Sequence, residues 1–225
     1  MVTILVPAYN EEDTIASTIR SLFTIPEINK VLVIDDGSTD RTADLAEDAG
    51  ASIIRLEKNL GKGGALNCAA PFVTSEVVGL MDADLGNSAE AIRPLILPVL
   101  NGEADLVIAR FPEKKPKAGF GIVKRMASLG LKVLADFDSS APLSGQRVMT
   151  HQVWKDVLPL NRGFGVEVGL SLKAARKGYR IMEVEVPLSH RFTRNDISGF
   201  FHRGKQLYHV LRAFFSFCFL KEGNN

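Results

Sequence analysis

Cysteine is scarce in this chain, net charge is almost absent, and no apolar run is long enough to cross a bilayer. The two cysteines, Cys68 and Cys218, match no metal-binding or redox spacing, so we expect reduced thiols in a cytoplasmic protein. Because 27 basic residues stand against 26 acidic ones, the overall charge gives no reason to expect a nucleic-acid partner. The apolar run at 213–220 is far too short for a transmembrane helix. No basic leader with an apolar core precedes the first β-branched run, and we expect no secretory signal.

The length and composition are those of a globular protein. The chain has 225 residues, of which 46% are hydrophobic and 24% charged, which does not indicate disorder, a fibre or a bundle of membrane helices. This length suffices for one well-buried domain. We therefore expect a single domain over residues 1–225, with a ligand-binding half at 1–110 and a second half at 111–225.

Apolar runs and helical patterns alternate along the first half. Strands are predicted at 2–6, 31–34, 52–56, 77–81 and 105–109, and helices follow them, beginning near residues 15, 39, 65 and 90. This alternation predicts an α/β fold with a mostly parallel sheet and helices on both faces.

The second half has a different character. Residues 111–118 combine three lysines with two prolines, which predicts a loop and a candidate mobile lid. Beyond it we expect a loop with a strand at 142–148, an edge strand at 180–186, and helices at 122–135, 166–177 and 197–219.

Acidic or polar clusters follow three of the predicted strands. They are Pro7 to Glu11, Asp35-Asp36 and Asp82-Ala83-Asp84. Ligands of open parallel sheets bind beyond the carboxyl ends of the strands, so these clusters should converge. Carboxylates alone would repel a phosphate, whereas Mg²⁺ or Mn²⁺ can be held by one or two of them and bridge to a diphosphate. The alternative is that each cluster is a turn or a helix cap.

Lys62 lies on a glycine-rich turn that opens a helix, between Gly61 and Gly63. A cation at a helix N-terminus suits a diphosphate. The alternative is a solvated surface lysine.

The order of these segments carries a resemblance to a known family. The segments are Val6-Pro7-Ala8-Tyr9-Asn10-Glu11, Val33-Ile34-Asp35-Asp36-Gly37-Ser38-Thr39-Asp40, Gly61-Lys62-Gly63-Gly64-Ala65 and Asp82-Ala83-Asp84. Together they resemble the large inverting family-two-type glycosyltransferases that include the polyprenyl-phosphate (dolichol-phosphate mannose) sugar synthases.

That resemblance implies a GT-A fold and a donor site for a nucleoside-diphosphate sugar. It implies a nucleoside pocket lined by Pro7, Ala8, Glu11 and Asp36, with Asp35 near the base or ribose, Lys62 beside the diphosphate, and the Asp82/Asp84 pair, a DXD motif, at ribose and metal. Asn10, Gly63 and Ala83 complete the expected donor-binding set.

The second half resembles the glucosyl-3-phosphoglycerate synthases and related retaining enzymes. The segments are Pro142-Leu143-Ser144-Gly145-Gln146, Gly163-Phe164-Gly165-Val166-Glu167-Val168-Gly169-Leu170 and His190-Arg191. They imply that Glu167 contacts the sugar hydroxyls and that His190 joins Asp84 on the metal. The acceptor would be met by Ser144, Gly145, Gln146, Arg147 and Glu167, and the expected catalytic residues are Lys62, Asp84 and Glu167.

Two of these residues have simpler interpretations. His190 as a neutral imidazole suits Mn²⁺ better than Mg²⁺, and its alternative is a surface histidine at a strand end. Glu167 could instead be a first-turn carboxylate favoured by the helix dipole.

The acceptor stays open between a polyprenyl phosphate, which we place first, and a small phosphorylated molecule such as 3-phosphoglycerate. A basic cluster beside the site could hold an acceptor phosphate, a membrane surface or the leaving diphosphate, or be a solvated loop: Arg110, Lys114, Lys115, Lys117, Lys124 and Arg125. The apolar stripe within 207–219 fits core packing or a homodimer interface, with peripheral docking at the inner face of the membrane as the alternative.

Two other functions compete with sugar transfer. A nucleotidyltransferase shares the sheet and the metal requirement, but usually has a glycine-rich basic loop after the first strand, where this chain has Ala8-Tyr9-Asn10-Glu11. A non-catalytic module would bind the sugar nucleotide with metal and turn nothing over.

Overall fold

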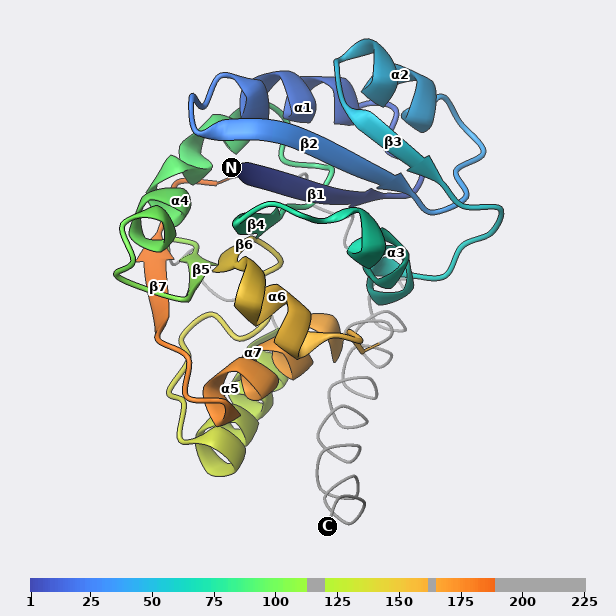
Figure 1. The fold of residues 1–225 in the computed structure, drawn as a ribbon. Coiled ribbons are helices and arrows are strands. Elements are labelled where there is room, and N and C mark those ends of the chain that lie inside the picture. The colour runs from blue at the N-terminus through green and yellow to red at the C-terminus, as the bar shows by residue number, and fades with distance from the viewer. Residues whose placement is uncertain (113–119, 162–164, 189–225) are drawn as a thin grey trace.

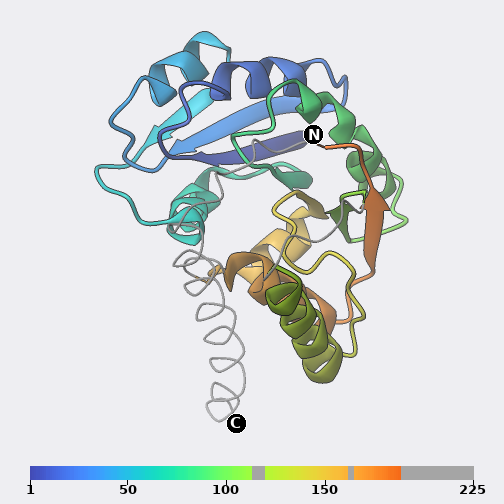
Figure 2. The same ribbon diagram turned by 180° about the vertical axis from the view of Figure 1, so that it is seen from behind.

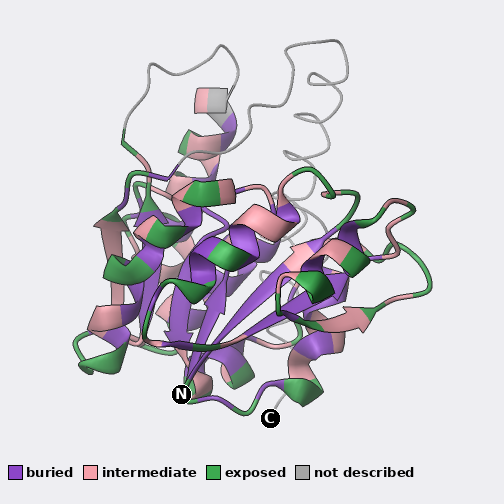
Figure 3. Cartoon of the chain, turned by 90° about the horizontal axis from the view of Figure 1, so that it is seen from above, coloured by how far each residue is buried: buried purple, intermediate pink, exposed green. Residues whose placement is uncertain are grey.

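A seven-stranded sheet forms the centre of the computed structural model, which describes residues 1–112, 120–161 and 165–188 (Figure 1). Its order within these residues is β3-β2-β1-β4-β6-β5-β7. The strands are β1 (Val2–Ala8), β2 (Ile28–Asp35), β3 (Ser52–Arg55), β4 (Val77–Leu80), β5 (Leu106–Arg110), β6 (Arg147–Thr150) and β7 (Ile181–Glu185). The central strands β1 and β4 are buried almost throughout, as expected of strands covered on both faces (Figure 3).

Most of the strand pairs are parallel, which confirms the predicted sheet. β1 pairs in parallel with β2 and β4, β2 with β3, and β5 with the edge strand β7. β6 is the exception, because it lies antiparallel between β4 and β5. Its first residue, Arg147, is opposite Leu80, the last residue of β4. The segment that leads into β6 therefore lies beyond the carboxyl end of β4.

Helices cover both faces of the sheet (Figures 1 and 2). Helices α1 (Ile15–Phe23), α2 (Thr42–Asp48) and α4 (Arg93–Leu100), with the 3-10 helix η2 (Gly86–Ile92), contribute to one apolar cluster. On the other face, α3 (Lys62–Ala69), α6 (His151–Val157) and α7 (Val166–Arg176) contribute to a second cluster, and the 3-10 helix η1 (Ala70–Phe72) follows α3. Helix α5 (Phe120–Ala135) packs against α7 in a third, smaller cluster.

Several boundaries differ from the sequence prediction for local reasons. Helix α2 begins at Thr42 rather than at 39, because the Asp40 carboxylate accepts a hydrogen bond from the Thr42 amide at 2.9 Å. Helix α3 begins at Lys62, so Gly63 and Gly64 lie inside its first turn. The short helix α6 was not predicted; the Thr150 hydroxyl caps it by accepting from the Val153 amide.

Four predicted features lie outside the described residues: most of the lid at 111–118, the motif residues Gly163-Phe164, the pair His190-Arg191 and the terminal helix at 197–219. Within the described ranges, no helix combines the length and the apolar character that a membrane span needs.

Candidate functional site

The carboxyl ends of β1, β2 and β4 meet at one edge of the sheet. Ala8 at the end of β1 is paired with Asp35 at the end of β2, and Leu5 of β1 is paired with Leu80 of β4. The Asp36 amide continues this contact by donating to the Ala8 carbonyl at 2.8 Å. The three polar clusters predicted from the sequence therefore lie at the same edge.

The acidic residues after β2 organise loops. Asp36 is buried, and its two carboxylate oxygens accept from the amides of Leu60 at 2.7 Å and Gly61 at 2.8 Å. Asp35 is also buried and accepts from the Ser38 amide at 3.1 Å. Asp36 thus fixes the turn that immediately precedes Lys62.

The segment after β1 is tied to the loop after β2. The side-chain oxygen of Asn10 accepts from the Thr39 amide at 2.9 Å, and the Glu11 amide donates to the Thr42 hydroxyl at 2.7 Å. Ala8 is buried, whereas Pro7 is half-buried and Asn10 exposed. Asn10 and Glu11 are therefore connected to the loop after β2, and together they form a partly exposed edge of the site, the nucleoside rim.

Lys62 joins three elements that are distant in the sequence. From the start of α3, its Nζ lies 2.7 Å from Asp82 Oδ1, beyond β4, and 2.9 Å from Glu167 Oε1, in the first turn of α7. Burial alone would lower the pKa of Lys62, but the charges of Asp82 and Glu167 and their hydrogen bonds outweigh it and raise the pKa above its ordinary value. Lys62 is therefore a fixed cation between two carboxylates.

The segment before β6 completes this cluster from the other side. Gln146 is fully buried, and its Nε2 donates to Asp82 Oδ2 at 2.6 Å, so both oxygens of Asp82 are held. A Cβ atom on Gly145 would lie 2.6 Å from Asp82 Oδ2 and 2.8 Å from Lys62 Nζ. A larger residue at this position would require the ends of the Asp82 and Lys62 side chains to move.

Two buried polar atoms beside the cluster have no hydrogen-bond partner among the described residues. They are the Ser144 hydroxyl oxygen and the side-chain oxygen Oε1 of Gln146. Buried polar groups are almost always paired in native proteins. Atoms of this kind next to Asp82 suit the hydroxyl groups of a bound ligand.

Arg147 differs from its expected place on the acceptor side. Its side chain is 1% exposed, and its guanidinium donates inward to the Ser144 carbonyl at 2.9 Å and the Ser171 hydroxyl at 2.7 Å. Burial lowers its pKa to about 10, against the opposing effect of the charges of Glu167 and Glu183. In this structure Arg147 supports the loop that carries Ser144 and Gly145 from within.

Gly63 and Ala83, two of the expected donor-binding residues, are packed against protein. A Cβ on Gly63 would lie 1.9 Å from the Asn161 carbonyl oxygen, so glycine there allows the loop before α7 to approach α3. Ala83 is buried in the cluster that includes Ile15 and Ile19 of α1.

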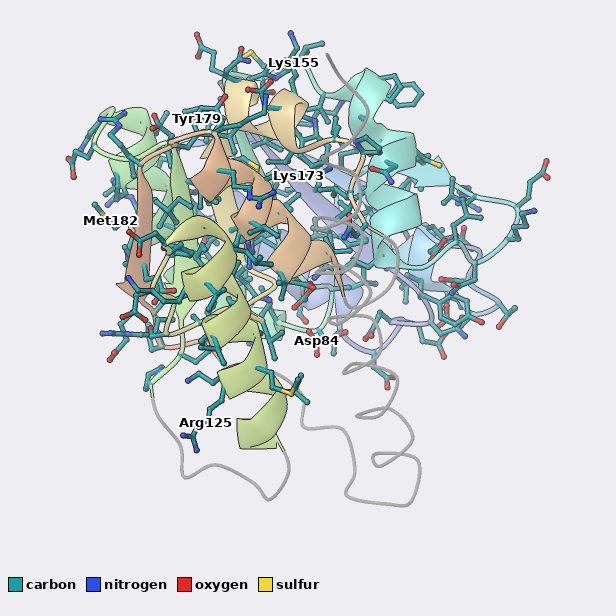
Figure 4. All side chains as sticks on the ribbon, turned by 90° about the horizontal axis from the view of Figure 1, so that it is seen from below. Asp84, Arg125, Lys155, Lys173, Tyr179 and Met182 are labelled. Carbon is teal, nitrogen blue, oxygen red and sulfur yellow. The ribbon has the colours of Figure 1, made fainter. Side chains whose placement is uncertain are left out.

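Asp84 is the described half of the expected metal site, since His190 lies outside the described residues. Figure 4 shows Asp84 well away from Lys155, Lys173 and Tyr179, which surround the other end of α7. No group of three or more metal-ligating side chains occurs in the described part of the chain. A hard carboxylate oxygen suits Mg²⁺ or Mn²⁺, and these ions often use only one or two protein carboxylates when they also bind substrate phosphates. The donor chemistry therefore fits a cation shared with a diphosphate.

Sequence reasoning missed Asn67, the residue that connects α3 to the loop before α7. Asn67 in α3 donates through Nδ2 to the Leu160 carbonyl at 3.0 Å and accepts from the Leu160 amide at 2.7 Å. A polar residue on a half-buried helix face looks the same whether it faces solvent or another loop. Both bonds go to the Leu160 backbone, which every residue type shares, so the residue type at position 160 carries no signal of the contact.

Comparisons with known proteins agree with this arrangement. The family model described as Glycosyl transferase family 2 matches residues 3–147. Glycosyltransferase AglJ of Haloferax volcanii is 32% identical over 189 residues, which cover 80% of this chain and 60% of AglJ, so the chain spans less than two thirds of that relative.

Solved structures extend the likeness beyond residue 147. Glucosyl-3-phosphoglycerate synthase from Mycobacterium tuberculosis, in complex with Mn²⁺, UDP and phosphoglyceric acid, has a TM-score of 0.82 at 26% identity, covering 99% of this chain and 80% of that one. The complex of the same enzyme with Mg²⁺ and UDP also has a TM-score of 0.82 at 26% identity, covering 97% of this chain and 79% of that one.

Proposed function

The chain belongs to glycosyl transferase family 2, and from this premise we propose that it transfers a sugar from a nucleoside-diphosphate sugar to a phosphate-bearing acceptor. The observation that carries the proposal is the bridge from Lys62 Nζ to Asp82 at 2.7 Å and to Glu167 at 2.9 Å. It joins the two halves of the chain at the sheet edge where ligands of such folds bind. We propose that residues 1–225 act as one domain, with 1–110 binding the donor and 111–225 the acceptor.

The proposed donor is UDP-glucose, with GDP-sugars as the alternative. Support comes from the two solved complexes of glucosyl-3-phosphoglycerate synthase, which both contain UDP. Pro7 near the end of β1, with Asn10 and Glu11 beyond it, would line the nucleoside pocket, because all three are at least partly exposed at this edge of the sheet. Asp35 and Asp36 would support the pocket indirectly, because they accept hydrogen bonds from the backbone of the neighbouring loops at Ser38 and Leu60.

Asp84 and His190 would hold Mn²⁺ or Mg²⁺, which neutralises charge on the departing diphosphate when bound. Carboxylate and imidazole groups are both ligands of Mn²⁺, which supports this assignment. Asp82 is already engaged on both oxygens, by Lys62 and Gln146, and a carboxylate so engaged suits a hydroxyl contact better than a metal.

The remaining roles follow from charge and reach. Lys62 would stabilise, from its place between Asp82 and Glu167, the negative charge that develops on the diphosphate. Asp82, Glu167 and Gln146 would accept hydrogen bonds from sugar hydroxyls. A phosphate acceptor is already a nucleophile, so the reaction would need positioning more than a general base.

Two acceptors share the required chemistry. A polyprenyl phosphate is the first expectation from the sequence, and residues 207–219, which carry the apolar stripe behind it, lie outside the described residues. A small phosphorylated acid such as 3-phosphoglycerate is supported by the relative that holds phosphoglyceric acid and aligns over 99% of this chain. Ser144 and Gly145, on the loop beside Asp82, would face either acceptor.

A panel of sugar nucleotides tests the proposal. UDP- and GDP-sugars are screened by thermal shift with Mn²⁺, Mg²⁺ or EDTA, since a ligand at 100 times its Kd stabilises by about 2.7 kcal/mol. The best donor is then incubated with 3-phosphoglycerate or with vesicles containing polyprenyl phosphate, and released nucleoside diphosphate is measured.

The outcomes separate the candidate functions. Metal-dependent release stimulated by one acceptor supports sugar transfer and identifies the acceptor source. Metal-dependent binding without release under any condition would identify a non-catalytic module. Release of sugar 1-phosphate instead of nucleoside diphosphate would identify a nucleotidyltransferase, because the nucleotidyl group would then move to the acceptor and sugar 1-phosphate would be the leaving group.

A further inference from the structure

Thr18, a fully buried residue in α1, holds the segment that carries Asp84 on both sides. Its hydroxyl donates to the Ala83 carbonyl at 2.8 Å and accepts from the Gly86 amide at 2.8 Å. A hydroxyl has one proton to donate and two lone pairs, so one threonine can make both bonds. The Ala83–Asp84 and Leu85–Gly86 peptide groups, on either side of Asp84, are thereby bonded to one oxygen atom.

The packing around these bonds excludes water from them. Ala83 and Leu85, the neighbours of Asp84, are 5% and 3% exposed and share an apolar cluster with α1. Gly86 has a φ of 54°, in the left-handed region that favours glycine, as the chain turns into η2. Asp84 itself is half-buried between its two buried neighbours. Its backbone is therefore held more tightly than that of an ordinary turn.

The same helix also contacts the segment after β1. The Thr14 hydroxyl, one turn before Thr18, donates to the Glu11 carboxylate at 3.2 Å, and the Thr18 amide donates to the Thr14 carbonyl at 3.0 Å. One turn of α1 therefore connects the expected nucleoside rim to the Asp84 segment.

We propose that Thr18 is a positioning residue that orients Asp84 for a divalent cation shared with a nucleoside diphosphate. This inference rests on the proposed function. A metal ligand binds well when its surroundings fix its orientation, and loss of such support typically weakens metal affinity by about 10- to 100-fold. Because Thr18 acts on the backbone around Asp84 rather than on its carboxylate, we expect the lower end of that range, about 10-fold.

The test uses Thr18→Val, which keeps the shape of the side chain and removes the hydroxyl. The dissociation constant of UDP, or of GDP if it binds more tightly, is measured by calorimetry with Mn²⁺ and with EDTA. We expect the Mn²⁺-dependent gain in affinity to fall by about 10-fold while the affinity in EDTA stays the same, because the nucleoside rim is untouched. Thr18→Ser retains the hydroxyl and should keep most of the gain.

Thr3→Val is the matched control. Thr3 is also buried, at the opposite end of β1, and its hydroxyl bonds to the Ser75 hydroxyl. It loses a buried hydrogen bond of the same kind far from Asp84, so its Mn²⁺-dependent gain should equal that of the wild type. If Thr18→Val does not fold, as judged by circular dichroism, Thr18→Ala supplies the same loss of the hydroxyl.

Three results are decisive. A reduced gain in Thr18→Val, restored in Thr18→Ser and unchanged in Thr3→Val, supports the positioning role. An unchanged gain in folded Thr18→Val, or an equal reduction in Thr3→Val, overturns it. If the wild type itself shows no gain with Mn²⁺, the proposed function fails, and that failure is visible before any variant is compared.

Discussion

Residues 1–110 and 120–188 contribute to the candidate site in different ways. The first region places its charged groups by local order, since each acidic cluster directly follows a parallel strand whose neighbours end at the same edge. The second region reaches the site through an antiparallel strand and a helix. Gln146 contacts Asp82 across 64 residues of sequence, and Glu167 contacts Lys62 across 105.

The two regions would therefore have different tasks: the first provides the charged groups, and the second orients them. In the proposed function, Asp82, Asp84 and Lys62 of the first region would supply charge for a diphosphate and its cation. Gly145, Gln146 and the loop behind them in the second region determine where those charges point. We therefore expect first-region substitutions to remove activity and second-region substitutions to weaken it in graded amounts.

The largest effect should come from Asp84→Ala. Loss of the described metal ligand would remove about 4 kcal/mol of transition-state stabilisation, which corresponds to about 1,000-fold in kcat/KM. Nucleoside diphosphate release in Mn²⁺ is the measurement, and Asp48→Ala, at an exposed aspartate on α2, is the control. Activity near the wild-type level would show that the reaction does not depend on Asp84.

Lys62→Met should follow, with a decrease of about 100-fold in kcat/KM. The variant loses the cation that would face the diphosphate and leaves Asp82 and Glu167 without their shared partner. Steady-state release assays measure the decrease, with Lys58→Met at an exposed lysine as the control. An equal loss in both variants would mean that general surface charge, rather than this ion pair, matters.

The sequence could predict the elements of the first region better than the contacts of the second. An Asp-x-Asp motif at a strand end can be recognised in the sequence, because the strand, the turn and the acidic residues are contiguous. The predicted α/β fold and the family resemblance were confirmed. The start of α3 at Lys62 was missed because glycines usually disfavour helices, whereas here Gly63 must admit the backbone of Asn161. The inward turn of Arg147 and the role of Thr18 depend on tertiary neighbours that no local pattern encodes. The roles of the predicted site residues stay predictions.

Gly145→Ala tests alignment alone, because it adds one methyl group and changes no charge. The new Cβ would meet Asp82 and Lys62 at 2.6 and 2.8 Å, so the ion pair must shift. A displacement of about 1 Å at a reacting centre can cost about 100-fold, and we expect a decrease of about 10- to 100-fold in kcat with little change in stability. Gly121→Ala, where an added Cβ meets no atom of the described residues within 4 Å, is the control. Wild-type activity in Gly145→Ala would show that the second region does not align the pair.

Gln146→Glu makes the same alignment depend on pH. At about pH 8 the new carboxylate would face Asp82 at the present 2.6 Å contact, and repulsion should lower kcat by about 10-fold. As the pH falls, the added group takes up a proton and can again donate to Asp82, so activity relative to the wild type should recover. A pH profile of both proteins measures this, and a constant ratio across the range would contradict it.

The smallest effect should come from Glu183→Gln. It tests whether the hydrogen bonds of Glu183 hold in place the loop that leads to Gly145 and Gln146. Glu183 in β7 accepts hydrogen bonds from the Ser139 hydroxyl at 2.6 Å, the Ser140 amide at 3.1 Å and the Ala141 amide at 3.2 Å. Burial alone would raise the pKa of Glu183, but these bonds outweigh it and lower the pKa below 4.5. The ionised group therefore stabilises the fold above its unfolded-state pKa, and this contribution is lost as the pH falls through the lowered folded-state pKa.

Urea unfolding at neutral and acidic pH measures that contribution. Glu183→Gln should unfold with about 1 kcal/mol less free energy at pH 7, and it should lose less stability than the wild type on acidification. Glu185→Gln, which breaks only an exposed ion pair with Arg110, is the control and should change little. If the loop is held by Glu183, Glu183→Gln should be less active than the wild type at pH 7, and this difference should shrink on acidification as the difference in stability does. Activity that stays constant while stability falls would show that Gly145 and Gln146 are aligned by β6 and Arg147 instead.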